Sequence, residues 1–216
     1  VQKAQGKIVV PQGKWLELSV SEEACRDLSP LAALKPGDLQ KLELPDNTTD
    51  DSLWHIRSLT ALQHLRLYAN HVTDSGLEHI IHSRGLTSLS LNRTRISDEG
   101  LSHLEKLTTL EKLILYQNPN ITGTGLKHLR DLPALKRLHI YSTGINKLGV
   151  AYIGELSRLT GLYIPKAGIT DDDLAHFKQL TRLEELYIDS NRLTDEGLIH
   201  LKMMTNLKEL SLSSNP

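Results

Sequence analysis

Residues 86–118 of this 216-residue chain read LTSLSLNRTRISDEGLSHLEKLTTLEKLILYQN, and this stretch decides the fold. It contains the pattern L-x-x-L-x-L-x-x-N/T twice, beginning at Leu86 and at Leu110. In each copy the last two leucines lie two residues apart, which is the period of a half-buried strand. Between the copies, a leucine recurs every third residue, at Leu101, Leu104 and Leu107. That spacing gives a short helix one apolar stripe, so each copy is predicted to be a strand followed by a short helix.

The same pattern recurs along the chain from residue 39 to its end. The eight copies begin at Leu39, Leu62, Leu86, Leu110, Leu135, Leu159, Leu183 and Leu207. A single strand with a short helix cannot bury its apolar face alone, but stacked copies can. The sequence therefore predicts an α/β solenoid that forms a curved arc. Its parallel β-sheet lines the concave face, and its short helices cover the convex face because they are wider than the strands.

Two further features mark the corners of each repeat. The ninth residue of the pattern is expected to hydrogen-bond the turning backbone from inside, with Ala167 as a break in the row. The members of this row are Asn47, Asn70, Thr94, Asn118, Thr143, Asn191 and Asn215. A hydroxyl followed by an acid predicts the start of a helix, because the hydroxyl caps free backbone N–H groups and the acid suits the positive end of the helix dipole. These pairs are Thr73-Asp74, Ser97-Asp98, Thr170-Asp171 and Thr194-Asp195.

The consensus of the copies is I-T-D-x-G-L-x-H-L-x-x-L-T-x-L-x-x-L-x-L-x-x-N/T. It resembles the 24-residue leucine-rich repeats abundant in bacterial proteins, planctomycetes especially. The resemblance covers Leu39 to Pro216, with a degenerate copy around Trp15. It implies a domain division into an N-terminal cap with a degenerate repeat (1–38) and eight leucine-rich repeats, the last incomplete (39–216). It also implies a binding surface, since this family mostly supplies such surfaces to varied partners.

Composition bounds the classes of function. The formal net charge is −1, so no overall field favours nucleic acid or an anionic membrane. Cys25 is the single cysteine, which excludes an intrachain disulfide, and no run of 18 apolar residues predicts a membrane span. The first ten residues are not a signal peptide. We therefore favour a cytoplasmic location, while the start at Val1 leaves open an export signal removed upstream.

The sequence offers no catalytic or cofactor motif, so we predict no enzyme and no cofactor. Six histidines occupy the same helix position in different repeats: His55, His79, His103, His128, His176 and His200. Packed helices lie about 10 Å apart, whereas a metal ion needs ligands at about 2.1 Å, so we interpret these histidines as a consensus position and predict no metal site. The acids of residues 170–173 are interpreted as a helix cap rather than a calcium loop.

The third, fifth and seventh residues of each copy point away from the core and define the concave face. Five of the six tyrosines fall in these three columns. Tyrosine and arginine are enriched in the hot spots of protein interfaces, so we predict recognition of another protein here. Basic residues in mid-array and acidic residues toward the C-terminal end would orient that partner. The candidate binding residues are His64, Arg66, Tyr68, Lys112, Tyr116, Arg137, His139, Tyr141, Tyr163, Glu185, Tyr187 and Asp189.

Three alternatives remain at this point. Tyrosine also suits strands, so the tyrosine columns are alternatively a purely structural ladder that stabilises the sheet. The array is alternatively a structural spacer within a larger protein, or its mixture of tyrosine, arginine and histidine binds carbohydrate or nucleic acid by stacking. Nucleic acid is the less favoured partner because the net charge is close to zero. The strand edge at the C-terminal end is a candidate for self-association.

Overall fold

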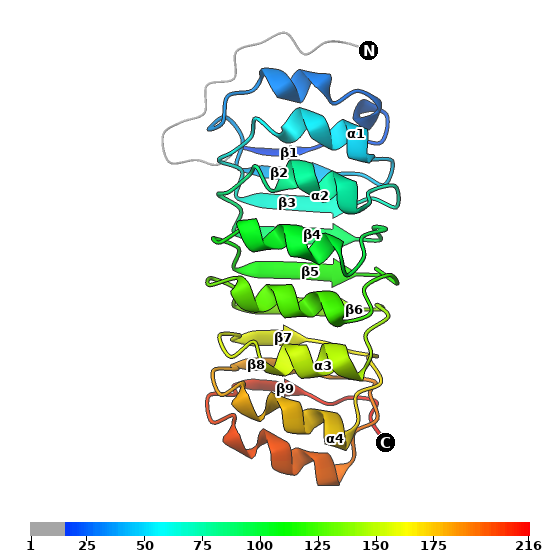
Figure 1. Ribbon diagram of the computed structural model, residues 1–216, viewed down its shortest axis with the longest axis vertical. Helices are drawn as coiled ribbons and strands as arrows, with labels where there is room; N and C mark the ends of the chain where they lie inside the picture. Colours follow the sequence, from blue (N-terminus) through cyan, green and yellow to red (C-terminus); the bar gives the residue numbers. More distant parts are fainter. Residues whose placement is uncertain (1–15) are drawn as a thin grey trace.

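The computed structural model describes residues 16–216, which form one nine-stranded parallel sheet whose strands follow chain order (Figure 1). The strands are β1 (Glu17–Ser19), β2 (Lys41–Leu44), β3 (His64–Tyr68), β4 (Ser88–Asn92), β5 (Lys112–Tyr116), β6 (Arg137–Tyr141), β7 (Gly161–Tyr163), β8 (Glu185–Tyr187) and β9 (Glu209–Ser211). Equivalent repeat positions pair throughout, as Leu65 does with Leu89 and Leu89 with Leu113. The sequence prediction of a leucine-rich-repeat solenoid is confirmed.

Short helices connect the strands and all cover the same face of the sheet (Figure 1). The α-helices are α1 (Asp50–Leu53), α2 (Asp74–Ile80), α3 (Lys147–Gly154) and α4 (Asp171–Leu174). The 3₁₀ helices are η1 (Ala24–Arg26), η2 (Ser29–Ala33), η3 (Trp54–Ile56), η4 (Gly100–Lys106), η5 (Thr124–Asp131), η6 (Ala175–Gln179) and η7 (Asp195–Met203). The 3₁₀ form follows from the leucine spacing, because three residues per turn place every third side chain on one line.

The core is a continuous apolar layer between the sheet and the helices. Strands β2 to β8 contribute the fourth and sixth residues of the pattern, such as the fully buried Leu113 and Leu115, whereas Leu210 of β9 is exposed. Each helix contributes its stripe, and Leu101 and Leu104 are likewise buried. The stripe of η7 differs, since Leu198 is 39% exposed. This difference arises because β9 and η7 are the last elements of the stack and no later repeat of the described chain packs on them.

The corner after each strand depends on a pair of residues. The eighth residue adopts the left-handed region, with φ between 53° and 61°, at Arg93, Gln117, Ser142, Lys166, Ser190 and Ser214. This turn directs the ninth residue inward, so that the Nδ2 of Asn191 donates to the carbonyls of Ile164 and Ile188, 3.1 and 2.8 Å away. Its Oδ1 accepts from the N–H of Ala167. The predicted inward row is confirmed at Asn118, Asn191 and Asn215. It is wrong at Thr143, which follows the same turn at Ser142 but is half-buried and makes no side-chain hydrogen bond within the described residues.

Asn70 corrects that prediction. The residue before it, Ala69, is fully buried and is not in the left-handed region, so the chain leaves the strand by a different turn. Asn70 is therefore exposed, and its Nδ2 donates to the carboxylate of Asp46 rather than to a buried carbonyl. Asn47 also lacks a left-handed residue before it, yet its Nδ2 donates to the backbone carbonyl of Glu22, so the two corners without this turn differ from each other.

The acids at the helix starts also link neighbouring repeats. The carboxylate of Asp74 accepts from both the N–H and the hydroxyl of Ser97 in the next repeat, at 2.8 and 2.6 Å. Asp98 is partly buried, which alone would raise its pKa, but hydrogen bonds from Thr122 and Thr124 outweigh burial and hold the pKa below its ordinary value. The sequence predicted a capping role for these pairs, and the structure adds that Asp74, Asp98 and Asp171 each fasten one repeat to the next.

The N-terminal segment continues the stack. β1 pairs in parallel with β2, and Leu18 of β1 packs against the core. Cys25 is 3% exposed, with its Sγ 3.2 Å from the Oγ1 of Thr48, and burial raises the pKa of its thiol. The residues from Val1 to Trp15, including much of the predicted cap, lie outside the described part of the chain.

Candidate binding surface

The predicted residues of the concave face lie on the sheet surface that faces away from the helices. Eleven of the twelve are in strands β3, β5, β6, β7 and β8, and Asp189 follows β8 by two residues. Side chains alternate across a strand, so burial of the fourth and sixth positions places the third, fifth and seventh on the opposite face. The structure arranges these residues around two adjoining features: a cluster of tyrosines over β5–β8 and a hollow centred on β2–β5. The two features share Tyr116, Tyr141 and Tyr163.

The first feature is a tier of four tyrosines, which we call the tyrosine tier: Tyr116, Tyr141, Tyr163 and Tyr187. The rings of Tyr116 and Tyr141 meet edge to face, with centroids 6.0 Å apart. Tyr163 lies 6.4 Å from Tyr116 and 5.5 Å from Tyr187. All four side chains are half-buried, so each rests on its neighbours and still offers one surface to a ligand. Contacts of this kind hold the rings in fixed positions before any partner binds.

His139 is part of the same packing. Its ring stacks on Tyr163 with centroids 5.5 Å apart and an interplanar angle of 26°. Burial, together with the positive charge of Lys112, lowers the pKa of His139 from 6.5 to about 4. His139 is therefore neutral at pH 7 and contributes a flat, uncharged ring to the concave face.

The charges beside the tyrosine tier differ from the sequence expectation. Arg137 of β6 reaches across the intervening strand to Glu185 of β8, with its Nη2 2.8 Å from the Oε1 of Glu185. Gly161 of β7 lies between them and has no side chain to obstruct this contact. Because Arg137 is neutralised by Glu185 and His139 is uncharged, the remaining positive charge in this part of the face comes from Lys112 and from Lys166, whose Nζ lies 5.8 Å from the centre of the Tyr141 ring. The mid-array basic region is therefore weaker than the residue types alone predict.

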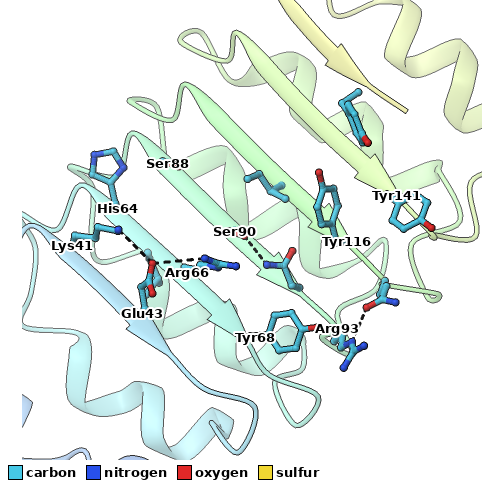
Figure 2. A pocket seen from close by; sticks show the side chains of 15 residues that line it. Lys41, Glu43, His64, Arg66, Tyr68, Ser88, Ser90, Arg93, Tyr116 and Tyr141 are labelled. Carbon is cyan, nitrogen blue, oxygen red and sulfur yellow. Dashed lines mark hydrogen bonds and ion pairs between the residues drawn. The ribbon is translucent and has the colours of Figure 1, made fainter. Parts of the chain in front are cut away.

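The second feature is a hollow of about 810 Å³ centred on strands β2–β5, which Tyr141 of β6 and Tyr163 of β7 also line. Its floor consists of small side chains from β4, Ser88, Ser90 and Asn92, and large side chains rise on either side. Figure 2 shows Arg66 and Tyr68 on the β3 side and Tyr116 on the β5 side. Sequence reasoning identified these walls and missed the floor. The signal was present, because β4 has small residues in all three outward columns.

The charged residues of the hollow are partly matched to one another. Lys41 contacts Glu17 at 2.5 Å and Glu43 at 3.3 Å, and Glu43 also lies 3.8 Å from Arg66. These four residues compensate each other. Arg93 is different: its guanidinium lies 5.0 Å from the centre of the Tyr68 ring, and its Nε donates to the side-chain oxygen of Gln117 at 2.6 Å (Figure 2). It has no acidic partner among residues 16–216.

The described residues contain no cluster of three or more histidine, cysteine or acidic side chains that could hold a metal ion. Over the same residues, no helix has the length and apolar character that a membrane crossing requires. The outward columns instead combine flat aromatic rings, amides, hydroxyls and separated charges. Such a surface is suited to non-covalent contact.

The lowered pKa of His139 gives a testable consequence for stability. The unfolded chain takes up a proton near pH 6.5 and the folded chain only near pH 4, so protonation favours unfolding as the pH falls through this window. Native protein is expected to lose about 1–2 kcal/mol of stability from this group between pH 7 and pH 4, allowing for solvent screening of a partly exposed ring. Urea denaturation of His139→Gln should show a flatter pH profile than the native chain.

A matched control is His176→Gln, which removes an exposed histidine of η6 on the convex face. Comparing the native chain with both variants removes the contribution of the other titrating groups, which affect the stability of all three proteins equally at low pH. Parallel profiles for His139→Gln and the native chain between pH 7 and pH 4 would contradict the assignment of a neutral, partly buried His139.

Comparison with known proteins agrees with this architecture. The family model described as "Leucine Rich repeat" matches residues 82–104 and 179–202. The crystal structure of internalin C2 from Listeria monocytogenes is similar, with a TM-score of 0.62 and 26% identity over 82% of this chain and 72% of that one. A crystal structure of a TLR13–ssRNA13 complex is similar in fold, with a TM-score of 0.67 and 19% identity over 92% of this chain and 29% of that one. A search of curated proteins finds no match.

The chain therefore has the fold of a leucine-rich-repeat solenoid, with structural neighbours among the internalins and the TLR13 repeats. Domains of this class typically serve as scaffolds for binding and are usually non-catalytic. No catalytic family is evident for this chain.

Proposed function

We propose that this protein is a non-catalytic recognition module that binds another protein on its concave face. The tyrosine tier carries this proposal. Four half-buried tyrosines on strands β5–β8 contact one another through rings held 5.5–6.4 Å apart. Rigid aromatic side chains of this kind supply large contact area at a low cost in conformational entropy.

Polar side chains around the tier would set the orientation of the partner. We assign this role to Lys112 and Asp189, with the Arg137–Glu185 pair presenting hydrogen-bonding groups rather than net charge. His139 contributes ring surface next to Tyr163. The three candidate residues of β3, His64, Arg66 and Tyr68, extend the contact surface toward the N-terminal end.

The proposal is tested by replacing three tyrosines of the tier with serine, as Tyr116→Ser/Tyr141→Ser/Tyr163→Ser. Serine occupies outward columns elsewhere in the array, at Ser88, Ser90, Ser211 and Ser213, so the fold should accept it. The native chain and the variant are immobilised and used to capture proteins from the lysate and secreted fraction of the source organism. A partner retained at least tenfold better by the native chain is the expected result.

The matched control carries three substitutions on the convex face, Lys127→Ser/Lys178→Ser/Lys202→Ser, at exposed helix positions. It should retain the partner fully, and circular dichroism must show that both variants are folded. Equal capture by the native chain and the tyrosine variant would move the site away from the tier. Capture of no protein by any of them would favour the spacer function.

We further assign the repeats to the 24-residue bacterial type and divide the chain into a cap (1–38) and eight repeats (39–216). The support is the spacing of the copies, which is 23 to 25 residues throughout. The parallel pairing of β1 with β2 supports a degenerate repeat within the cap.

A further inference from the structure

We infer that the hollow over β2–β5 receives an acidic loop of the partner protein. This inference rests on the proposed function, that a protein binds the concave face, and names the chemistry of one part of that protein. Four observations carry it: the shape of the hollow, its uncompensated charges, an amide oxygen without a donor, and the distribution of acids along the rest of the face.

The shape comes from one strand with small side chains between two strands with large ones. Ser88, Ser90 and Asn92 of β4 lie in register with His64, Arg66 and Tyr68 of β3. On the other side, Ser88 pairs with Lys112 and Ser90 with Ile114 of β5. Adjacent strands are about 4.8 Å apart, so the walls on β3 and β5 stand about 10 Å apart, which is wide enough for one extended segment of chain.

The unpaired charges near the hollow determine which charge the bound segment should carry. Glu17, Lys41, Glu43 and Arg66 compensate one another through contacts of 2.5–3.8 Å. Two cations are left over: Arg93, which follows β4 and lines the hollow, and Lys112, which lies beside the lining residue Ser88 at the start of β5 without lining the hollow itself. Neither has an ion-pair partner within the described part of the chain. They lie at opposite ends of the floor, so a segment along β4 would meet one cation at each end.

The floor also lacks a hydrogen-bond donor. Asn92 is 4% exposed, and its Nδ2 donates to the Oγ of Ser90 at 2.8 Å. Its Oδ1 has no partner. Buried polar atoms in folded proteins are nearly always partnered, and an atom without a partner calls for an explanation. A peptide N–H is a donor that an incoming loop supplies, whereas a phosphate backbone offers only acceptors.

The remainder of the face argues for a loop rather than a long polyanion. Toward the C-terminal end, the outward columns contain Glu185, whose charge Arg137 balances, and Asp189 and Glu209, which have no ion-pair partner among residues 16–216. A nucleic acid lying along the arc would bring its phosphates against these acids, and two surplus cations would release few counterions on binding it. A short acidic loop meets only the hollow and avoids that repulsion.

The experiment measures binding of a defined probe to the full chain. The probe is a fluorescein-labelled cyclic peptide containing the sequence Asp-Glu-Asp, followed by fluorescence anisotropy. Its partner probe is the same ring containing Asn-Gln-Asn. We expect the native chain to bind the acidic ring at least tenfold more tightly than the amide ring, and the complex to weaken as salt is added.

Two variants test the two parts of the argument. Arg93→Gln/Lys112→Gln removes the surplus cations, and Ser90→Tyr fills the hollow without changing charge; a tyrosine already occupies the equivalent column at Tyr163 and Tyr187. Each should weaken binding of the acidic ring at least fivefold. The convex control Lys127→Gln/Lys178→Gln should bind within twofold of the native chain. Thermal unfolding shows whether Ser90→Tyr is folded, and the charge variant tests the inference independently of it.

Three results would overturn the inference: no binding of the acidic ring at millimolar concentration, equal binding by the charge variant, or tighter binding of a ten-nucleotide oligouridylate than of the ring. None of them would affect the proposed function, which depends on capture through the tyrosine tier. Conversely, loss of partner capture by the charge variant alone, with capture retained by the tyrosine variant, would keep the hollow as a site and overturn the assignment to the tier.

Discussion

Replacing Phe177 with alanine is expected to lower the free energy of unfolding by about 3–5 kcal/mol. Phe177 is the only phenylalanine of the chain, lies in η6 and is fully buried. In other repeats its helix position holds a smaller aliphatic residue, such as Leu104 or Ile153. Truncation at Phe177 therefore leaves a cavity between the sheet and the two neighbouring helices, α3 and η7. Urea denaturation followed by circular dichroism measures the loss.

The effect should also be local. In a solenoid each repeat contacts its neighbours, so stability is close to a sum of repeat and interface terms. η6 packs against α3 on one side and η7 on the other. Hydrogen exchange of Phe177→Ala should therefore lose protection first in β7, β8 and β9, while β3–β5 keep theirs. A uniform loss over all strands would contradict this description of the stack.

The conservative control is Phe177→Leu, which installs the residue found at this position in other repeats. It retains most of the apolar volume and is expected to cost about 1–1.5 kcal/mol. A cost for Phe177→Leu equal to that of Phe177→Ala would show that the aromatic ring itself, rather than its volume, stabilises this part of the core.

The fold was predictable from the sequence because one short pattern recurs eight times. Equivalent positions are apolar in every copy, so the secondary structure of an irregular copy is predicted from the regular ones. The backbone geometry was not predictable in the same way. The left-handed turn at Arg93, Gln117 and equivalent positions uses residue types without a strong preference for that region. Asn70 was misplaced for this reason, because its position depends on the turn made by Ala69.

The sequence predicted which residues lie on the concave face, but it did not predict the contacts between their side chains. A period of two places Tyr116, Tyr141 and Tyr163 on one face, whatever the details of packing. The Arg137–Glu185 contact spans two repeats and depends on Gly161 having no side chain, so inspection of neighbouring strands does not reveal it. The hollow exists because β4 has no large outward side chain. Three small residues in register with large ones carry no binding signal of their own in the sequence.

Replacing Asn118 with alanine is the second substitution with a large expected effect, a loss of about 2–4 kcal/mol of stability. Asn118 is fully buried at a repeat corner. Its Nδ2 donates to the carbonyls of Leu91 and Tyr116, at 2.8 and 3.2 Å. Its Oδ1 accepts from the N–H and the hydroxyl of Thr94, at 2.9 and 2.6 Å. Alanine leaves buried groups of two repeats without these hydrogen-bond partners.

Thr143 supplies the matched control, because it occupies the same column and is only half-buried. Its hydroxyl makes no hydrogen bond within the described residues, so Thr143→Ala should cost less than about 1 kcal/mol. Asn118→Asp separates the two halves of the network: it keeps the acceptor toward Thr94 and loses the donor toward Leu91. At pH 7 a buried carboxylate facing a carbonyl should cost at least as much as alanine, and part of the loss should return at low pH as the acid is protonated. Equal stability of Asn118→Ala and Thr143→Ala would show that packing of the leucines alone holds the corner, and that its hydrogen bonds are replaced without cost.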